Sequence, residues 1–284
     1  MNSRRKFVKL AGTGLLAAGV TSVYSSEVEP VKESVQSVKP ADLFGIGIAG
    51  YTFMQLSVDK AIEIMKRVGV TFLSLKDVYM PMNSTQEVIT SVMDKFKAAG
   101  INVYTVGVVY MKTQESVDQA FAYAKMSGVN MIVGAPNYEL LAYTEKKVKE
   151  YDFKLAIHNH GPDNPLYPNA TDIWNHIKDM DPRMGICIDI GHTIRDGQDP
   201  SVDINRYSKR IFDMHIKDVD KAAREGKTIE MGRGVIDIPL VVATLRKVRY
   251  SGKCSLEFEK DMKDPLAGIA ESIGYFKGVC AAGK

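Results

Sequence analysis

LAIHNH (155–160), GICIDIGH (185–192) and IFDMHIKD (211–218) are three short apolar runs that each become polar at the C-terminal end. A fourth run, CSLEFE (254–259), ends with two glutamates. A β/α barrel presents its active site on residues at the carboxyl ends of its strands. Imidazole and carboxylate groups are the ligand types of divalent metals. These four runs therefore predict a barrel with a metal site at its mouth.

The chain from residue 45 onward alternates between the sequence period of strands and that of helices. Buried parallel strands, rich in Ile, Val, Leu and Phe, are predicted at 45–51, 71–76, 101–108, 130–135, 154–160, 185–190, 211–217 and 254–259. Amphipathic helices are predicted between and after them, at 57–69, 84–100, 113–128, 139–151, 170–179, 200–209, 237–249 and 264–279. Eight such units in about 240 residues predict a single-domain α/β protein, a (β/α)8 TIM barrel over residues 43–284. An open doubly wound sheet is the alternative, and it is disfavoured because no glycine-rich phosphate loop follows the first strand.

The N-terminus predicts export. The stretch SRRKFVKLAG (3–12) places two adjacent arginines before a short apolar segment, a pattern that resembles a twin-arginine (Tat) export signal. The apolar segment is too short to span a bilayer, so a stable membrane anchor is not expected. We therefore expect an export signal over residues 1–25, a polar linker over 26–42 and a periplasmic location.

Composition limits the class of partner. The formal net charge is +3, and no basic stripe or aromatic platform indicates nucleic-acid binding. The spacing of the three cysteines predicts neither a disulfide nor a cysteine metal site. The sequence leaves the oligomeric state open and is compatible with a homo-oligomer.

Residues two apart in a strand share one face. The polar residues of five predicted strands therefore fall into sets that face the barrel axis: Ser74 with Lys76, His158 with His160, Asp189 with Cys187, Asp213 with His215 and Lys217, and Ser255 with Glu257 and Glu259. The apolar residues that alternate with them suit packing against the helices. Buried charges are costly unless they are paired or bound to a metal. The convergence of these sets at the barrel mouth therefore predicts that their charges are paired with one another or bound to a metal.

Each site residue also has an ordinary structural interpretation. Asp189 could cap the following helix, and Glu257 could pair with Lys217. A single His at a strand end is more often part of a structural hydrogen bond than a ligand, but four adjacent strands would then need four unrelated reasons. His176 lies in a helical stretch, DIWNHIKDM, and is expected on the surface.

The order of these motifs resembles the xylose isomerase-like barrel superfamily of sugar isomerases and epimerases, over residues 43–280. DIGH supplies the Asp-x-x-His of the sixth strand, HIKD the His of the seventh strand, and SLEFE the Glu of the eighth. The stretch 232–259 also resembles the family's run from a glycine-rich loop into the last strand.

The resemblance implies a small carbohydrate substrate and one divalent metal ion. The expected metal ligands are His158, Asp189, His215 and Glu257. Mixed nitrogen and oxygen ligands favour Mn, with Co, Zn, Fe or Mg as alternatives. Such an ion polarises a substrate carbonyl and stabilises the enediolate that forms when the neighbouring carbon loses a proton.

The other polar residues at the strand ends are assigned to proton transfer and substrate binding. The expected proton-transfer residues are Glu257, Lys76, His160 and His192. The expected substrate-binding residues are Lys217, Glu259 and His192. Either lysine could neutralise a developing oxyanion or assist a leaving group.

One departure from the family pattern leaves the reaction open. Sugar epimerases of this family usually have Glu as the ligand on strand five, where this chain has His158 in HNHG. A His-x-His there is similar to the inosose dehydratase branch, which eliminates water next to a ketone. The sequence therefore predicts a metal-dependent sugar isomerase or epimerase that removes a proton α to a carbonyl, with a lyase or dehydratase that performs β-elimination as the alternative. A non-catalytic periplasmic sugar-binding protein is the alternative from another class.

Overall fold

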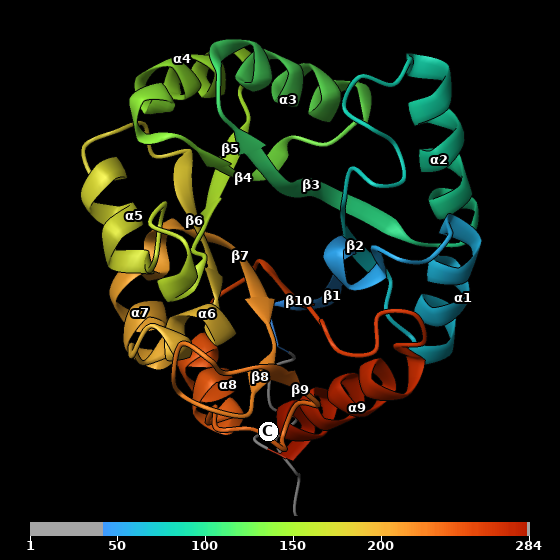
Figure 1. Ribbon diagram of the computed structural model, residues 1–284, viewed down its shortest axis with the longest axis vertical. Helices are drawn as coiled ribbons and strands as arrows, with labels where there is room; N and C mark the ends of the chain where they lie inside the picture. The colour runs from blue at the N-terminus through green and yellow to red at the C-terminus, as the bar shows by residue number, and fades with distance from the viewer. Residues whose placement is uncertain (1–41, 283–284) are drawn as a thin grey trace, which may run out of the picture. The chain divides into compact units, whose positions relative to one another are not determined.

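Residues 42–282 are described by the computed structural model, and they contain a closed barrel of eight parallel strands surrounded by helices (Figure 1). The prediction of a (β/α)8 barrel is confirmed. The expected export signal, and the expected linker up to residue 41, lie outside the described residues.

The barrel strands follow one another around the barrel in the order of the sequence. They are β1 (Gly45–Ala49), β2 (Phe72–Leu75), β3 (Asn102–Met111), β4 (Met131–Pro136), β5 (Lys154–His158), β6 (Met184–Asp189), β7 (Ile211–Ile216) and β10 (Lys253–Leu256). Two short strands, β8 (Asp218–Val219) and β9 (Thr228–Ile229), form an antiparallel pair in the connection that leaves β7. Strand β3 runs three residues beyond its predicted end at residue 108.

The helices lie in a ring outside the barrel (Figure 1). They are α1 (Val58–Val68), α2 (Gln86–Ala98), α3 (Gln114–Met126), α4 (Leu141–Tyr151), α5 (Ala170–Ile177), α6 (Ile190–Arg195), α7 (Pro200–Tyr207), α8 (Ile238–Lys247) and α9 (Leu266–Ala282). Short 3-10 turns are η1 (Gly50–Phe53), η2 (Tyr138–Leu140), η3 (Gly161–Asp163) and η4 (Ser208–Arg210). Helix α6 was not predicted; it is a short helix that begins directly at the end of β6.

Local sequence signals start and stop these helices. The Ser57 side chain accepts a hydrogen bond from the backbone N–H of Lys60 at 3.2 Å and so caps α1. Gly69 ends the same helix in the left-handed conformation, with φ of 64°, which glycine adopts without steric cost. Thr113 and Ser116 form a reciprocal capping box at the start of α3.

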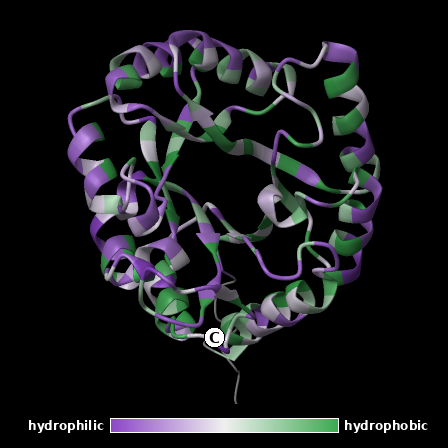
Figure 2. Ribbon diagram, viewed as in Figure 1, coloured by the Kyte–Doolittle hydropathy of each residue, from purple (hydrophilic) through white to green (hydrophobic). Residues whose placement is uncertain are grey.

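The two faces of each strand have different roles. Leu155, Ile157 and Ile188 are fully buried and belong to the main core between the strands and the helices. Ala156 and Cys187, on the alternate positions, form a separate small cluster that we assign to the barrel interior. In Figure 2 the ring helices carry both hydrophilic and hydrophobic residues, as helices with one buried face do. The predicted division of each strand into an axial and a helix-facing set is therefore confirmed.

Asp213 is buried with other polar groups inside the barrel. The Tyr104 hydroxyl lies 2.8 and 2.9 Å from the two oxygens of the Asp213 carboxyl group, and 2.7 Å from the Ser255 hydroxyl. Burial raises the pKa of Asp213 to about 7. This cluster satisfies the polar groups that the sequence places two residues before the site residues of β7 and β10.

No helix within residues 42–282 combines the length and the apolar character that a membrane-spanning segment requires.

Candidate metal centre

Four side chains from neighbouring strands meet at the mouth of the barrel. His158 ends β5, Asp189 ends β6, His215 lies one residue before the end of β7, and Glu257 directly follows β10. These strands are consecutive in the barrel. Each residue offers a ligand atom that lies within 4.8 Å of those of the other three. The structure thus brings together the four residues that the sequence predicted as metal ligands.

The strand register explains why they meet. Asp189 pairs with His215 across β6 and β7. The backbone N–H of Glu257 donates to the carbonyl of Ile216 at 3.0 Å, which continues the β10–β7 ladder beyond the end of the strand. Parallel pairing therefore places the ends of these strands at nearly the same height.

The ligand atoms surround one small buried space. His158 Nε2 lies 3.0 Å from His215 Nδ1 and 3.6 Å from Asp189 Oδ2. His215 Nδ1 lies 3.4 Å from Glu257 Oε1. All four residues are at most 5% exposed. Two imidazoles and two carboxylates at such distances form a donor set that suits a first-row divalent ion.

One oxygen of this group supports the fit to a cation. Asp189 Oδ1 accepts a hydrogen bond from the backbone N–H of His192 at 2.8 Å and so caps α6. Asp189 Oδ2 is buried and accepts no hydrogen bond within residues 42–282, and the Lys217 ammonium lies 3.1 Å from it as an ion-pair partner. Buried polar atoms are nearly always satisfied, so this carboxylate oxygen is suited to a metal ion. The capping interpretation and the ligand interpretation of Asp189 are compatible, because they use different oxygens.

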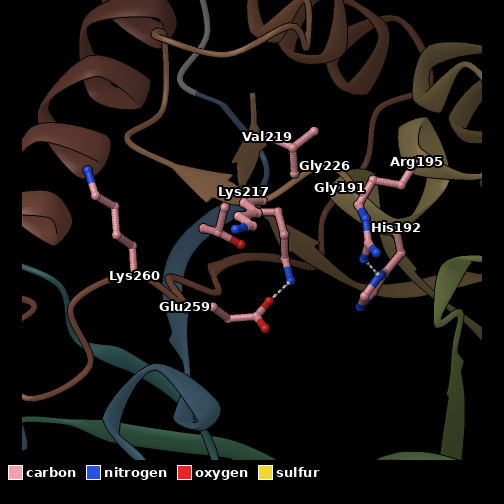
Figure 3. Close-up of a pocket in the computed structure, with 10 residues that line it drawn as sticks. Gly191, His192, Arg195, Lys217, Val219, Gly226, Glu259 and Lys260 are labelled. Atoms are coloured by element: carbon pink, nitrogen blue, oxygen red, sulfur yellow. Dashed lines mark hydrogen bonds and ion pairs between the residues drawn. The ribbon is translucent and has the colours of Figure 1, made fainter. Parts of the chain in front are cut away.

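Lys217 lies among the carboxylates of the site. Its Nζ is 3.1 Å from Asp189 Oδ2 and 2.8 Å from Glu257 Oε2, and it also contacts the carboxylate of Glu259 (Figure 3). The Lys217 side chain is 2% exposed. Burial alone would lower its pKa, but Asp189, Glu257 and Glu259 outweigh burial and raise the pKa of Lys217 well above its usual value. The ammonium is therefore charged at neutral pH, and Glu257 does pair with Lys217, the structural alternative that the sequence left open.

The ionisation states suit metal binding. Burial opposes the ionisation of Asp189, but the Lys217 ammonium outweighs it and holds the pKa of Asp189 well below its usual value. Burial likewise opposes the ionisation of Glu257, and Lys217 and His215 overcome it, so the pKa of Glu257 is also lowered. Burial lowers the pKa of His158, which keeps this imidazole neutral. Metal ligands must be deprotonated. His158, Asp189 and Glu257 already have lone pairs free for an ion at neutral pH.

Cys187 also lies within 4.8 Å of His158 and His215. Burial raises the pKa of its thiol well above the usual value. The thiolate is the metal-binding form of cysteine, so the neighbouring carboxylates are the better ligands at neutral pH.

His192 borders the site on α6. Burial lowers its pKa to about 4, so the ring is neutral. Arg195 Nη1 lies 3.3 Å from His192 Nδ1 (Figure 3). Because a guanidinium can only donate, Nδ1 is the acceptor and the proton of His192 is on Nε2. His192 can therefore donate a hydrogen bond from Nε2, in agreement with the predicted role in substrate binding.

Tyr110 is a residue of this region that the sequence did not predict. Its hydroxyl lies 2.7 Å from His160 Nε2, and the two ring centroids are 5.2 Å apart. The His160 ring in turn lies 4.8 Å from that of His158. The predicted third strand ended two residues before Tyr110; a longer strand would have placed its side chain at the barrel mouth.

A cavity of about 340 Å³ opens beside the centre. Its polar lining includes His192, Arg195, Lys217, Lys227, Glu259 and Lys260 (Figure 3). Three of these cations are paired with carboxylates: Lys217 contacts Glu259, Arg195 contacts Asp163, and Lys260 lies 2.8 Å from Glu230. The cavity thus offers a polar space next to Lys217, large enough for part of a small polyhydroxylated molecule.

Two other residues make contacts of their own. Lys76 Nζ donates to the carbonyl of Val108 at 2.8 Å and lies 3.0 Å from Asp77. None of its contacts within the described chain involves the four candidate ligands. His176 stacks on Tyr138 with a centroid distance of 4.1 Å and a side chain that is 38% exposed, so its predicted surface position is confirmed.

Asp218 organises the loop that borders the cavity. Its carboxylate accepts hydrogen bonds from the backbone N–H groups of Val219, Gly232, Gly234 and Ile236 at 2.9 to 3.2 Å. A Cβ at Gly234 would lie 2.2 Å from the Asp218 carboxylate, so the close approach requires glycine. This buried carboxylate fixes both ends of the loop next to Lys217.

Comparison with known proteins agrees with this architecture. The rhizopine catabolism protein MocC of Rhizobium meliloti is 29% identical over 131 residues, 41% of this chain and 40% of that protein. Inosose dehydratase of Lacticaseibacillus casei is 24% identical over 130 residues, 40% of this chain and 43% of that protein. The matches thus span less than half the length of these relatives.

A solved structure extends the likeness to most of the described chain. An uncharacterised protein of Parabacteroides distasonis is 27% identical and superposes with a TM-score of 0.66, covering 84% of this chain and 99% of that one. The sequence profile of the family described as xylose isomerase-like TIM barrel matches residues 55–279. This match includes all four candidate ligands, and the chain belongs to the xylose isomerase-like TIM barrel family.

Proposed function

We propose that this chain is a divalent-metal-dependent enzyme that removes a proton from the carbon next to the carbonyl of a keto-sugar or sugar derivative. The carrying observation is the buried group of two imidazoles and two ionised carboxylates, with the Lys217 ammonium beside it. His158, Asp189, His215 and Glu257 would hold the ion. When bound, a divalent ion polarises a carbonyl and stabilises negative charge on its oxygen.

The chain's own residues supply the proton transfer. Glu257 is ionised and can accept the substrate proton, and its two oxygens face different partners, His215 and Lys217. Lys217 is a fixed positive charge that offsets negative charge developing on a substrate oxygen. Most of the centre is shielded from water, which strengthens these electrostatic interactions.

Elimination is the outcome that the geometry favours over epimerisation. Epimerisation by the two-glutamate route of the family's epimerases requires carboxylates on opposite sides of the reacting carbon. Glu257 and Glu259 both follow β10 and therefore approach from the same wall of the barrel. The place of the second glutamate, on strand β5, is taken by His158, whose neutral imidazole is a candidate metal ligand. We therefore propose β-elimination from a keto-sugar, keto-inositol or keto-glycoside, and the dehydratase named among the relatives supports this choice.

Incubation of Mn-loaded enzyme in deuterated water with a panel of these ketones is the direct test. We expect recovered substrate to gain deuterium at the carbon next to the carbonyl, because the abstracted proton exchanges with solvent at an ionised carboxylate. We also expect a product that has lost water or the aglycone. Mass spectrometry detects both changes in one sample.

The other outcomes of this experiment are informative. A product that carries deuterium but has lost neither water nor the aglycone would indicate isomerisation or epimerisation. Binding of a sugar without deuterium uptake or product would contradict the enzyme proposal and support a sugar-binding protein. Metal analysis of the purified protein separates these cases further, since a binder has no need of the ion.

We also propose that the protein is exported in folded form through the twin-arginine route to the periplasm. The motivating observation is the sequence SRRKFV at residues 3–8. Replacing Arg4 and Arg5 with lysine is expected to leave the precursor in the cytoplasm. Cell fractionation and immunoblotting measure this, and an unchanged periplasmic yield would refute the proposed route.

A further inference from the structure

Tyr110 and His160 form a pair at the mouth of the barrel that the metal centre does not use. Tyr110 lies near the end of β3 and is 44% exposed, whereas His160 is 8% exposed. The Tyr110 oxygen lies 2.7 Å from His160 Nε2, and the rings are inclined by 35°. A phenol that is both solvent-accessible and held by a buried imidazole is suited to proton transfer.

The direction of this hydrogen bond follows from the other ring nitrogen. His160 Nδ1 is buried and has no hydrogen-bond partner among residues 42–282. A buried N–H without a partner is rarer in proteins than an acceptor without one. The neutral ring therefore has its proton on Nε2, which donates to the Tyr110 oxygen. The phenolic hydrogen is then free to point into the barrel mouth.

The barrel places this phenol opposite the basic side of the site. In the order β1-β10-β7-β6-β5-β4-β3-β2, strand β3 lies directly across the barrel from β7. Lys217 follows β7, and Glu257 follows its neighbour β10. A substrate that binds between these walls would have Glu257 on one side and Tyr110 on the other.

The phenol remains protonated at neutral pH. Burial raises the pKa of Tyr110, and the negative charge of Glu257 raises it further. A group with a raised pKa holds its proton until a more basic atom is formed next to it. An alkoxide or hydroxide that leaves a carbon during elimination is such an atom.

We propose that Tyr110 is the catalytic acid that protonates the leaving oxygen, with His160 as its positioning residue. This inference rests on the proposed elimination. The α C–H bond breaks and its proton passes to Glu257, while the electron pair moves onto the carbonyl oxygen to give the enolate. The carbonyl then re-forms, and the pair makes the double bond between the α and β carbons. The β C–O bond breaks, and the leaving oxygen takes the Tyr110 proton. The phenolate, held by the His160 Nε2–H, regains a proton from solvent, and Glu257 releases one to solvent.

The test compares two rates in Tyr110→Phe, which removes only the hydroxyl. The probe is the alkyl-linked keto-glycoside or keto-inositol that the wild type converts. We expect deuterium uptake at the α carbon within about 3-fold of wild type, because Glu257 is untouched. Elimination should fall by at least about 100-fold, the usual effect of losing a general acid. An equal loss of both rates, or no loss of either, overturns the assignment.

A pair of keto-glycosides with different leaving groups sharpens the test. Nitrophenolate leaves without a proton, so Tyr110→Phe should cleave a nitrophenyl keto-glycoside at nearly the wild-type rate and the methyl analogue slowly. A merely structural role of Tyr110 would slow both substrates equally. His160→Gln retains an N–H donor toward Tyr110 and should keep more elimination than His160→Ala does.

Tyr143→Phe is the matched control, since it also removes one phenolic hydroxyl that forms a hydrogen bond with a side chain. The Tyr143 hydroxyl lies 3.0 Å from both carboxylate oxygens of Asp118, between the outer helices α4 and α3. Both rates should be unchanged in this variant. A wild-type enzyme without any deuterium uptake contradicts the proposed function itself, whereas uptake with an unaltered Tyr110→Phe contradicts this inference alone.

Discussion

Asp189→Asn is expected to lose the metal ion and the activity together. The amide retains the volume of the side chain and an oxygen that can cap α6, but it removes the charge of a ligand that His158 and Lys217 surround. Loss of a group that merely orients a ligand already costs about 10–100-fold in metal affinity. We therefore expect the affinity of Asp189→Asn for Mn to fall by more than about 100-fold. Calorimetric titration with Mn, together with elemental analysis of the purified variant, measures this.

His176→Ala is the control for this experiment. His176 stacks on Tyr138 outside the barrel and should affect neither metal content nor turnover. Circular dichroism of Asp189→Asn is used to test whether the variant remains folded. Full Mn occupancy in that folded variant would show that the ion binds elsewhere.

Lys217→Met is expected to destabilise the metal-free protein strongly. The substitution leaves Asp189 and Glu257 buried without their ammonium partner. Removing one partner of a buried ion pair typically costs about 3–5 kcal/mol, because the remaining charge stays desolvated. Urea unfolding in the presence of a chelator measures the loss in the free energy of unfolding.

The same variant should bind a divalent ion more tightly. Two unit charges 4 Å apart interact by about 4 kcal/mol at an effective dielectric constant of 20. Loss of the ammonium should therefore tighten Mn binding by at least about 10-fold, and saturating Mn should restore most of the lost stability. Weaker Mn binding in Lys217→Met would show that Lys217 supports the ion rather than competes with it.

Lys95→Met is a useful comparison for stability. Lys95 forms an ion pair with Asp59 at 3.4 Å, but both side chains are more than half exposed. Exposed pairs contribute little because water screens them. A large effect of Lys217→Met and a small effect of Lys95→Met would attribute the loss to burial rather than to the change from Lys to Met.

Several features of the site required more than strand prediction. Tyr110 was missed because β3 is longer than its apolar run. Its partner His160 follows β5, which is two strands away from β3 in the barrel. The cap that Asp218 forms on the 218–236 loop joins residues 14 to 18 positions apart through hydrogen bonds to backbone groups. The periodicity of apolar residues along the sequence does not indicate such contacts.

The alternating sequence periods and the polar strand ends are enough to predict the barrel and the candidate ligand residues. Eight alternations of strand and helix leave few other folds, and the period of two along β5, β6 and β7 assigns His158, Asp189 and His215 to the axial face. The full set of partners of these polar groups depends on the closed barrel. Lys217 contacts carboxylates 28 to 42 residues away, and Tyr110 meets a histidine 50 residues later. The physical reason is that alternation fixes a side chain's direction, whereas an ion pair or hydrogen bond depends on distances of a few ångströms that barrel closure and register set.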